Sequence, residues 1–136
     1  MTNQELIEKA KSVVRPKQIR QYMVGDVGCA LLTDQDHLFL GVCIDVGSSM
    51  GFCAEHSAIG AMVTAGEFRI KKIVAVWKDD KNTYILAPCG RCREFIRQID
   101  ESNLETEVIL DIDRAVRLAE LLPSYGWFHK IEAPLS

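Results

Sequence analysis

Apolar residues recur with two different periods along the chain, and the change between them predicts a mixed α/β fold. An apolar stripe at helical spacing predicts a helix over residues 3–14, which Pro16 ends by restricting the residue before it and removing a backbone donor. Residues 27–33 and 37–45 are strand-like runs, and the turn formers Asp34-Gln35-Asp36 join them. These two runs therefore predict a hairpin.

The rest of the chain alternates helices with strands. Residues 53–65 predict a helix that Gly66 ends, and the continuously apolar run 73–77 predicts a strand buried on both faces. The remaining predicted elements are a strand over 84–86, a helix over 89–99, a strand over 107–110 and a helix over 115–122 that Pro123 ends. Since no repeat or linker interrupts this order, it predicts one α/β domain over residues 1–136 around a largely central sheet.

Composition and charge narrow the class of protein. The 136 residues carry a formal net charge of −3, so no cationic field is expected to attract nucleic acid or an anionic membrane. The first residues are charged throughout, unlike a secretory signal, and the longest apolar runs fall short of the roughly 20 residues that span a bilayer. Five cysteines, an odd number, argue against a disulfide scaffold. We therefore expect a cytoplasmic protein whose spaced cysteines bind a metal or react.

Three cysteines lie where two predicted helices begin. Cys89 and Cys92 form a CxxC pair at helical spacing, and Cys53 opens the helix upstream. Three thiolates brought together would hold a zinc ion and leave its fourth position open, which is the catalytic arrangement. Two alternatives stay open: a redox-active CxxC pair, and a structural four-cysteine zinc site completed by Cys43 or Cys29.

Glu55 gives the catalytic alternative its second component. A carboxylate two residues after Cys53 can take a proton from a zinc-activated water and return it to a leaving amine. The simpler explanation is a first-turn glutamate that interacts favourably with the helix dipole. The three cysteines in matching positions favour the catalytic role.

These motifs resemble those of a known family. Cys53-Ala54-Glu55 followed by Pro88-Cys89-Gly90-Arg91-Cys92 is similar to the zinc signature of the cytidine deaminases, a pattern already described for zinc deaminases. Val27-Gly28-Cys29-Ala30-Leu31 resembles a strand of the small members, and Glu120-Leu121-Leu122-Pro123 resembles their tail. The PCGRCR string and the segment Leu121–Trp127 also resemble blasticidin S deaminase.

The resemblance implies a fold, a reaction and an assembly. It implies a three-layer α/β/α fold with a central mixed sheet of about five strands, and a homotetramer or homodimer whose sites borrow residues from neighbours. Cys53, Cys89 and Cys92 would bind Zn²⁺, and Glu55 would shuttle protons. The reaction would convert a cytosine nucleoside, cytidine or deoxycytidine first, to its uracil form with release of ammonia. A blasticidin S-type or modified cytosine nucleoside is the alternative substrate.

The chain departs from the family where the family binds its substrate. Cys43 and Asp45 stand where family members hold the ribose with Asn and Glu, and the resemblance also places Ala54 in the substrate-binding set. Gly25 stands where an aromatic residue lines the base pocket, or it simply forms a turn before the strand. Aromatic residues that could fill this space are Phe39, Phe52, Tyr125 and Trp127. These departures bear on the substrate rather than on the reaction.

Three thiolates and Zn²⁺ leave one net negative charge, which disfavours ionisation of a bound water. Family members carry an arginine directly after the CAE motif, whereas this chain has His56. Arg91 or a charged His56 would therefore offset the charge. Two further classes are a non-catalytic zinc-stabilised binding domain and a nucleic-acid or nucleotide deaminase, and the acidic charge counts against the latter.

Overall fold

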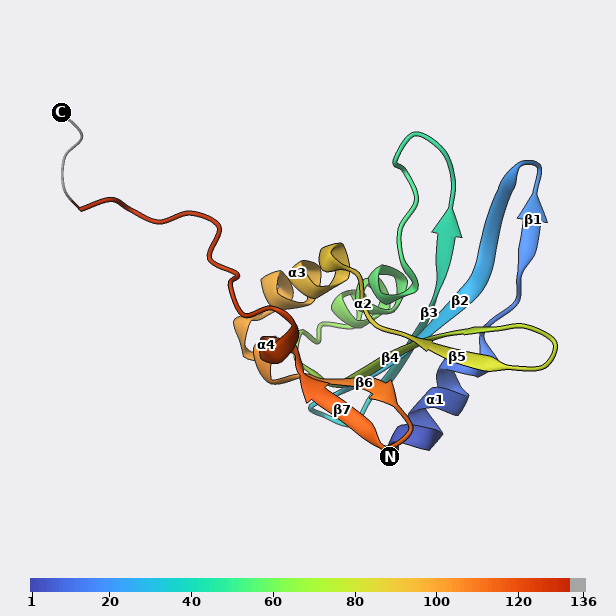
Figure 1. The fold of residues 1–136 in the computed structure, drawn as a ribbon, viewed down its shortest axis with the longest axis horizontal. Coiled ribbons are helices and arrows are strands. Elements are labelled where there is room, and N and C mark those ends of the chain that lie inside the picture. Colours follow the sequence, from blue (N-terminus) through green and yellow to red (C-terminus); the bar gives the residue numbers. More distant parts are fainter. Residues whose placement is uncertain (133–136) are drawn as a thin grey trace.

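Strand β2 (Tyr22–Thr33) organises the sheet in the computed structural model, which describes residues 1–132. It pairs with β3 along one edge and with β1 and β4 along the other. The elements are α1 (Asn3–Ser12), β1 (Lys17–Ile19), β2, β3 (Leu38–Asp45), α2 (Ala54–Thr64), β4 (Ile70–Lys78), β5 (Thr83–Leu86), α3 (Gly90–Ile99), the 3₁₀ helix η1 (Glu101–Glu105), β6 (Glu107–Asp111), β7 (Arg114–Arg117) and α4 (Leu118–Leu121) (Figure 1).

The sheet is mixed, as the resemblance implies. Five of its seven strands follow one hydrogen-bonded path, β1-β2-β4-β6-β7, while β3 pairs with β2 and β5 pairs with β4. Only β4 and β6 run parallel among the described pairs, and α3 and η1 make the crossover between them. The predicted α/β fold with a central mixed sheet of about five strands is confirmed.

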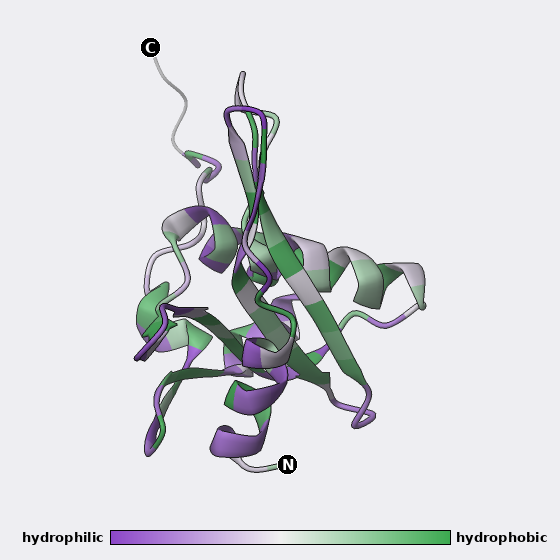
Figure 2. Ribbon diagram, turned by 90° about the vertical axis from the view of Figure 1, so that its right-hand side faces the viewer, coloured by the Kyte–Doolittle hydropathy of each residue, from purple (hydrophilic) through white to green (hydrophobic). Residues whose placement is uncertain are grey.

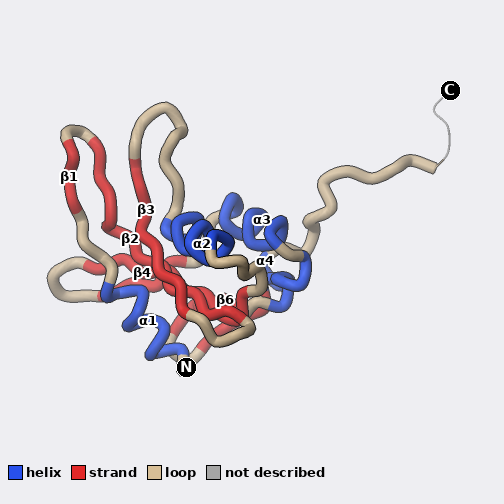
Figure 3. The backbone as a smooth tube through the Cα atoms, turned by 180° about the vertical axis from the view of Figure 1, so that it is seen from behind, coloured by secondary structure: helices blue, strands red, loops and turns tan. Residues whose placement is uncertain are grey.

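Helices cover both faces of the sheet, which makes three layers (Figures 1 and 3). On one face, Leu6 and Ala10 of α1 pack with Ala30 and Leu32 of β2. On the other face, α2, α3 and α4 pack against a cluster that includes Leu31. Because neighbouring residues of a strand point to opposite faces, this one strand contributes to both cores. Figure 2 shows the central strands largely apolar, whereas α1 shows polar residues on its outer side.

Helix α2 lies directly on β3 at Gly41. A Cβ atom at this position would overlap the backbone nitrogen of Ala58, so only glycine permits this approach. The Ser57 hydroxyl donates a hydrogen bond of 2.7 Å to the carbonyl oxygen of Val42 and fixes the helix along the strand. These contacts set the position of the first turn of α2 over the sheet.

The predicted helix over residues 115–122 is wrong in its first half. Residues 114–117 form β7, where Val116 pairs with Val108 of β6, and only Leu118–Leu121 are helical. Pairing with an available sheet edge overrides the local helical pattern here. The sequence prediction also missed β1, η1 and the first five residues of β2, where a register shift before Gly28 breaks the strand pattern.

After α4 the chain leaves the body as an extended arm (Figures 1 and 3). Its aromatic residues Trp127 and Phe128 are each 75% exposed and pack on each other with ring centroids 4.7 Å apart. Within residues 1–132, none of the helices is long and apolar enough to cross a membrane.

Candidate active site

The first turns of α2 and α3 meet over the same face of the sheet. Cys53 is the N-cap residue of α2, and Cys89 is the N-cap residue of α3. Both caps have extended backbone conformations and carry no side-chain cap hydrogen bond, so their sulfur atoms are available for other partners. The positive ends of both helix dipoles therefore lie beside these sulfurs.

The structure brings the three predicted cysteine ligands together. The Sγ atoms of Cys53 and Cys89 are 3.7 Å apart, and those of Cys89 and Cys92 are 3.5 Å apart. Zinc–sulfur bonds of about 2.3 Å at tetrahedral angles place two sulfurs about 3.8 Å apart. The Sγ atoms of Cys53 and Cys92 lie within 4.8 Å of each other, so the three sulfur atoms are close enough to share one zinc ion.

The two other cysteines lie elsewhere. Cys29 is fully buried in the core beneath α2, and its thiol pKa is raised by burial and by the charge of Glu55. Cys43 directs its thiol to Asp26, with its Sγ 2.8 Å from the Oδ1 of that carboxylate. Neither residue belongs to the group that surrounds Cys53 and Cys92, so neither supplies the fourth sulfur that a closed structural site would require.

The thiols do not share one electrostatic environment. Burial raises the pKa values of Cys53 and Cys92. For Cys89 burial acts in the same direction, but hydrogen bonds from backbone N–H groups and neighbouring thiols outweigh it and lower its pKa. Cys89 is therefore the thiol that ionises first, as expected at a helix N-terminus.

Glu55 lies next to the cysteines and lines the same cavity as Cys53 and Cys89. Only 5% of its surface is exposed, and burial raises the pKa of its carboxyl group, partly opposed by hydrogen bonds from its own backbone N–H and from Cys92. A buried carboxyl group with a raised pKa is suited to exchange protons near neutral pH.

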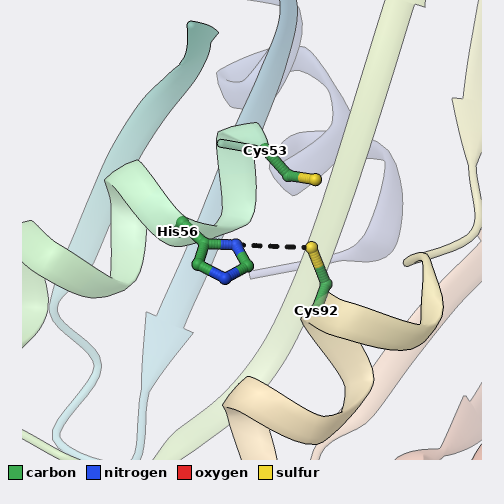
Figure 4. A group of neighbouring side chains, drawn as sticks. All are labelled: Cys53, His56 and Cys92. Atoms are coloured by element: carbon green, nitrogen blue, oxygen red, sulfur yellow. Dashed lines mark hydrogen bonds between the residues drawn. The ribbon is translucent and has the colours of Figure 1, made fainter. Parts of the chain in front are cut away.

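The two predicted charge-compensating residues, His56 and Arg91, both lie close to the cysteines. The Nδ1 atom of His56 lies 3.5 Å from the Sγ of Cys92 (Figure 4). The His56 ring also stacks on Phe95. Burial and the nearby Arg91 lower the pKa of His56, so its ring is neutral near pH 7. Arg91 lines the cavity above the sulfurs and donates a hydrogen bond of 3.4 Å to the carbonyl oxygen of Gly51.

A cavity of about 460 Å³ opens over this site. Cys53, Ala54, Glu55, Cys89 and Arg91 line it from the first turns of α2 and α3. Val27 of β2, Cys43 and Asp45 of β3, Phe52 and Leu86 also line it. The volume is within the range of small-molecule sites. Most of the predicted site residues therefore face one space.

The predicted aromatic residues lie in different places. Phe39 packs against the core beneath α2, whereas Phe52 lines the cavity. Tyr125 lies against Arg97 of α3, whose guanidinium carbon is 5.4 Å from the ring centroid, and Trp127 is on the exposed arm. Of the four aromatic residues predicted from the sequence, Phe52 lines the cavity in the part of the chain that the structure describes.

Asp26, which contacts the cavity-lining residue Cys43, is a residue that the sequence analysis missed. Its carboxylate accepts from the Cys43 thiol, and the Cys43 Sγ is also 3.9 Å from Oδ2 of Asp45. Burial, followed by the hydrogen bond to Asp26, raises the pKa of Cys43 to about 11, so this thiol stays protonated. The pairing register of β2 and β3 brings these residues together, and no spacing along the sequence signals it.

Gly25 has a conformational role. It has a φ of 78°, and an added Cβ would overlap the carbonyl oxygen of Arg15. Its own carbonyl accepts a hydrogen bond of 2.8 Å from the Arg15 backbone N–H. These constraints favour the turn explanation for glycine at this position.

Comparison with known proteins places this chain in a family. Residues 1–106 match the family described as "Cytidine and deoxycytidylate deaminase zinc-binding region". A cytidine deaminase of Mycobacterium tuberculosis is 31% identical over 99 residues, which cover 71% of this chain and 69% of that protein.

Solved structures agree with this match. The cytidine deaminase of Burkholderia pseudomallei is 27% identical, with a TM-score of 0.71 over 90% of this chain and 98% of that one. The crystal structure of the M. tuberculosis cytidine deaminase, 23% identical, has a TM-score of 0.72 over 92% and 97% of the two chains and agrees in fold. The protein therefore belongs to the cytidine and deoxycytidylate deaminase zinc-binding family.

Proposed function

We propose that this protein is a zinc-dependent deaminase that converts cytidine or deoxycytidine and water to the uracil nucleoside and ammonia. The observation that carries the proposal is the meeting of three zinc-compatible sulfurs with the buried carboxyl group of Glu55 at the wall of one cavity. The relatives named above are cytidine deaminases, which favours cytidine over blasticidin S and over a non-catalytic role.

Cys53, Cys89 and Cys92 would hold the zinc ion. When bound, zinc acts as a Lewis acid that lowers the pKa of water at its open coordination position. The helix N-termini at Cys53 and Cys89 stabilise thiolates, and Arg91 contributes a positive charge at the cavity wall. Because His56 carries a lowered pKa, Arg91 is the better candidate for charge compensation.

Glu55 would move the protons. Its carboxylate would take one proton from the attacking water and pass it to N3 of the cytosine ring as the oxygen bonds to C4. It would then take the remaining hydroxyl proton and deliver it to the exocyclic nitrogen, which leaves as ammonia while C4 becomes the carbonyl of the uracil. Burial next to the cysteines keeps this carboxyl group away from bulk water, so it exchanges protons with the substrate rather than with solvent.

The part of the cavity wall formed by β3 would bind the sugar. Asp45 offers carboxylate oxygens that accept hydrogen bonds from ribose hydroxyls, and Cys43 fills the wall beside it. Ala54, fully buried and small, leaves room for the base next to Glu55. Phe52 supplies an aromatic surface at the rim.

The exposed arm would complete a cytoplasmic homotetramer or homodimer. Trp127, Phe128 and Ile131 are largely exposed on the arm, and Met50 is 72% exposed on the loop after β3. Apolar side chains this exposed are typical of subunit interfaces. All five cysteines are free, which suits a reducing compartment. Sedimentation at micromolar concentration tests the assembly: a monomer would contradict it.

A substrate panel tests the proposed reaction. Ammonia release is measured with cytidine, deoxycytidine, cytidine monophosphate, cytosine and blasticidin S, together with the zinc content of the purified protein. We expect about one zinc per chain and turnover of cytidine or deoxycytidine above the other compounds. Zinc-loaded protein that releases ammonia from none of the nucleosides would overturn the proposal.

A further inference from the structure

His56 lies between two side chains of α3. Its Nδ1 atom is 3.5 Å from Sγ of Cys92 (Figure 4). Its ring lies parallel to that of Phe95, with a centroid distance of 4.3 Å and an interplanar angle of 3°. The residue follows Glu55 on α2, so its side chain crosses from one helix to the other.

Cys92 and Phe95 are three positions apart on α3, so they lie one above the other on the same face of the helix. Phe95 also packs against the core between the sheet and the helices, which restricts the movement of its own ring. A parallel stack on a restricted ring fixes the plane of the imidazole, and with it the direction in which Nδ1 points.

The chemistry of a metal-bound sulfur decides which atom donates. A thiolate that binds zinc carries no hydrogen and can only accept a hydrogen bond. The Nδ1 atom facing Cys92 must then carry the hydrogen, since two lone pairs at this distance would repel each other. Groups that hold a metal ligand in this way, without touching the metal, orient the ligand and strengthen metal binding.

We propose that His56 donates a hydrogen bond from Nδ1 to the zinc-bound Cys92 thiolate, and that Phe95 is the positioning residue that holds His56 in the donating orientation. This inference rests on the proposed binding of zinc by Cys53, Cys89 and Cys92. The competing arrangement has His56 itself as a zinc ligand, because its nitrogen lies within 4.8 Å of the sulfurs of Cys53 and Cys92.

The test measures metal binding on the full chain. Zinc affinity is obtained by competition with a chelator, and the sulfur-to-metal charge-transfer band is recorded with Co²⁺ in place of zinc. The variants are His56→Phe, which keeps an aromatic ring but removes the donor, and Phe95→Leu, which removes the stack but keeps an apolar side chain. Phe95→Tyr is the conservative rescue, and Phe68→Leu, at a half-exposed phenylalanine, is the matched control.

We expect His56→Phe and Phe95→Leu each to weaken zinc binding about 10- to 100-fold and to shift the Co²⁺ charge-transfer band. Phe95→Tyr and Phe68→Leu should match the wild type in both measurements. Near-ultraviolet circular dichroism confirms that each variant is folded, and the less disruptive Phe95→Leu keeps the test decisive if His56→Phe is unfolded.

Two results would overturn the inference. One is unchanged zinc affinity and an unchanged Co²⁺ spectrum in both folded variants. The other is a Co²⁺ spectrum of His56→Phe that shows a lost nitrogen ligand, which would make His56 a ligand of the metal. The Cys89→Ser variant tests the proposed zinc site separately. If Cys89 does not bind the metal, this variant will show the same intensity of the sulfur-to-metal charge-transfer band as the wild type.

Discussion

Cys53 and Cys89 are 36 residues apart in the sequence, yet their sulfur atoms lie 3.7 Å apart. Each sulfur is placed by the helix that its residue caps, and both helices are placed by the sheet face on which they pack. The separation between the two sulfurs is therefore a property of the whole fold. Contacts that fix α3 on the sheet also fix the site.

Asn103 is the clearest of these contacts. Its buried side chain accepts a hydrogen bond of 2.8 Å from the Ile70 backbone N–H and donates to the carbonyl oxygens of Phe68 and Ile96. Asn103→Ala leaves these backbone groups of β4, α3 and the loop before β4 unpaired, which should cost about 2 kcal/mol of unfolding free energy. Urea unfolding checks the value, with Asn82→Ala in an exposed loop as the control. Equal midpoints for the two variants would contradict this role.

A substitution at Asp45 tests whether this part of the cavity binds the sugar. Asp45→Asn removes a charged acceptor of hydrogen bonds, so the KM for cytidine should rise about tenfold while kcat changes little. Steady-state measurement of ammonia release checks this, with Asp80→Asn in an exposed loop as a variant of equal charge change. An unchanged KM would place the sugar elsewhere in the cavity.

Glu67, which lies outside the active site, should make the stability of the fold depend on pH. Hydrogen bonds from Thr33 and from His37, whose Nδ1 is 2.7 Å from Glu67 Oε2, lower the pKa of this carboxyl group from its ordinary value of 4.5. A lowered pKa in the folded state means that ionised Glu67 stabilises the fold above pH 4.5. This contribution is lost as the pH falls through the lowered pKa.

The variant Glu67→Gln should therefore lose less stability than the wild type between pH 7 and the acid range. Urea midpoints at several pH values measure the difference, and Glu8→Gln on the exposed side of α1 provides the control. Parallel pH profiles of the wild type and Glu67→Gln would show that the Glu67 carboxylate makes no such contribution.

Much of the site could be predicted from the sequence because its chemistry is local. Cys89 and Cys92 share a helix face at fixed spacing, and Glu55 follows Cys53 within one turn, so short motifs determine how these side chains stand relative to one another. Local spacing does not show that the Cys53 motif and the Cys89/Cys92 pair lie close together in space; the family resemblance implied that they do. The sheet then supplied the geometry.

The contacts that could not be predicted from the sequence are those between segments far apart in the chain. Asp26 meets Cys43 only through the register of β2 and β3, and Phe95 meets His56 only through the packing of α3 on α2. Residues 115–117 fall within the predicted helix, yet they pair with β6 because that strand offers an open edge. Local propensity is too weak to decide such cases.

The central claim is that Glu55 transfers protons at a zinc site. Zinc content and ammonia release from cytidine should be measured together on Glu55→Gln, which keeps the size of the side chain and removes its acid–base function. We predict about one zinc per chain and a kcat lowered about 10³-fold. A variant that retains zinc and deaminates cytidine at the wild-type rate would contradict the account.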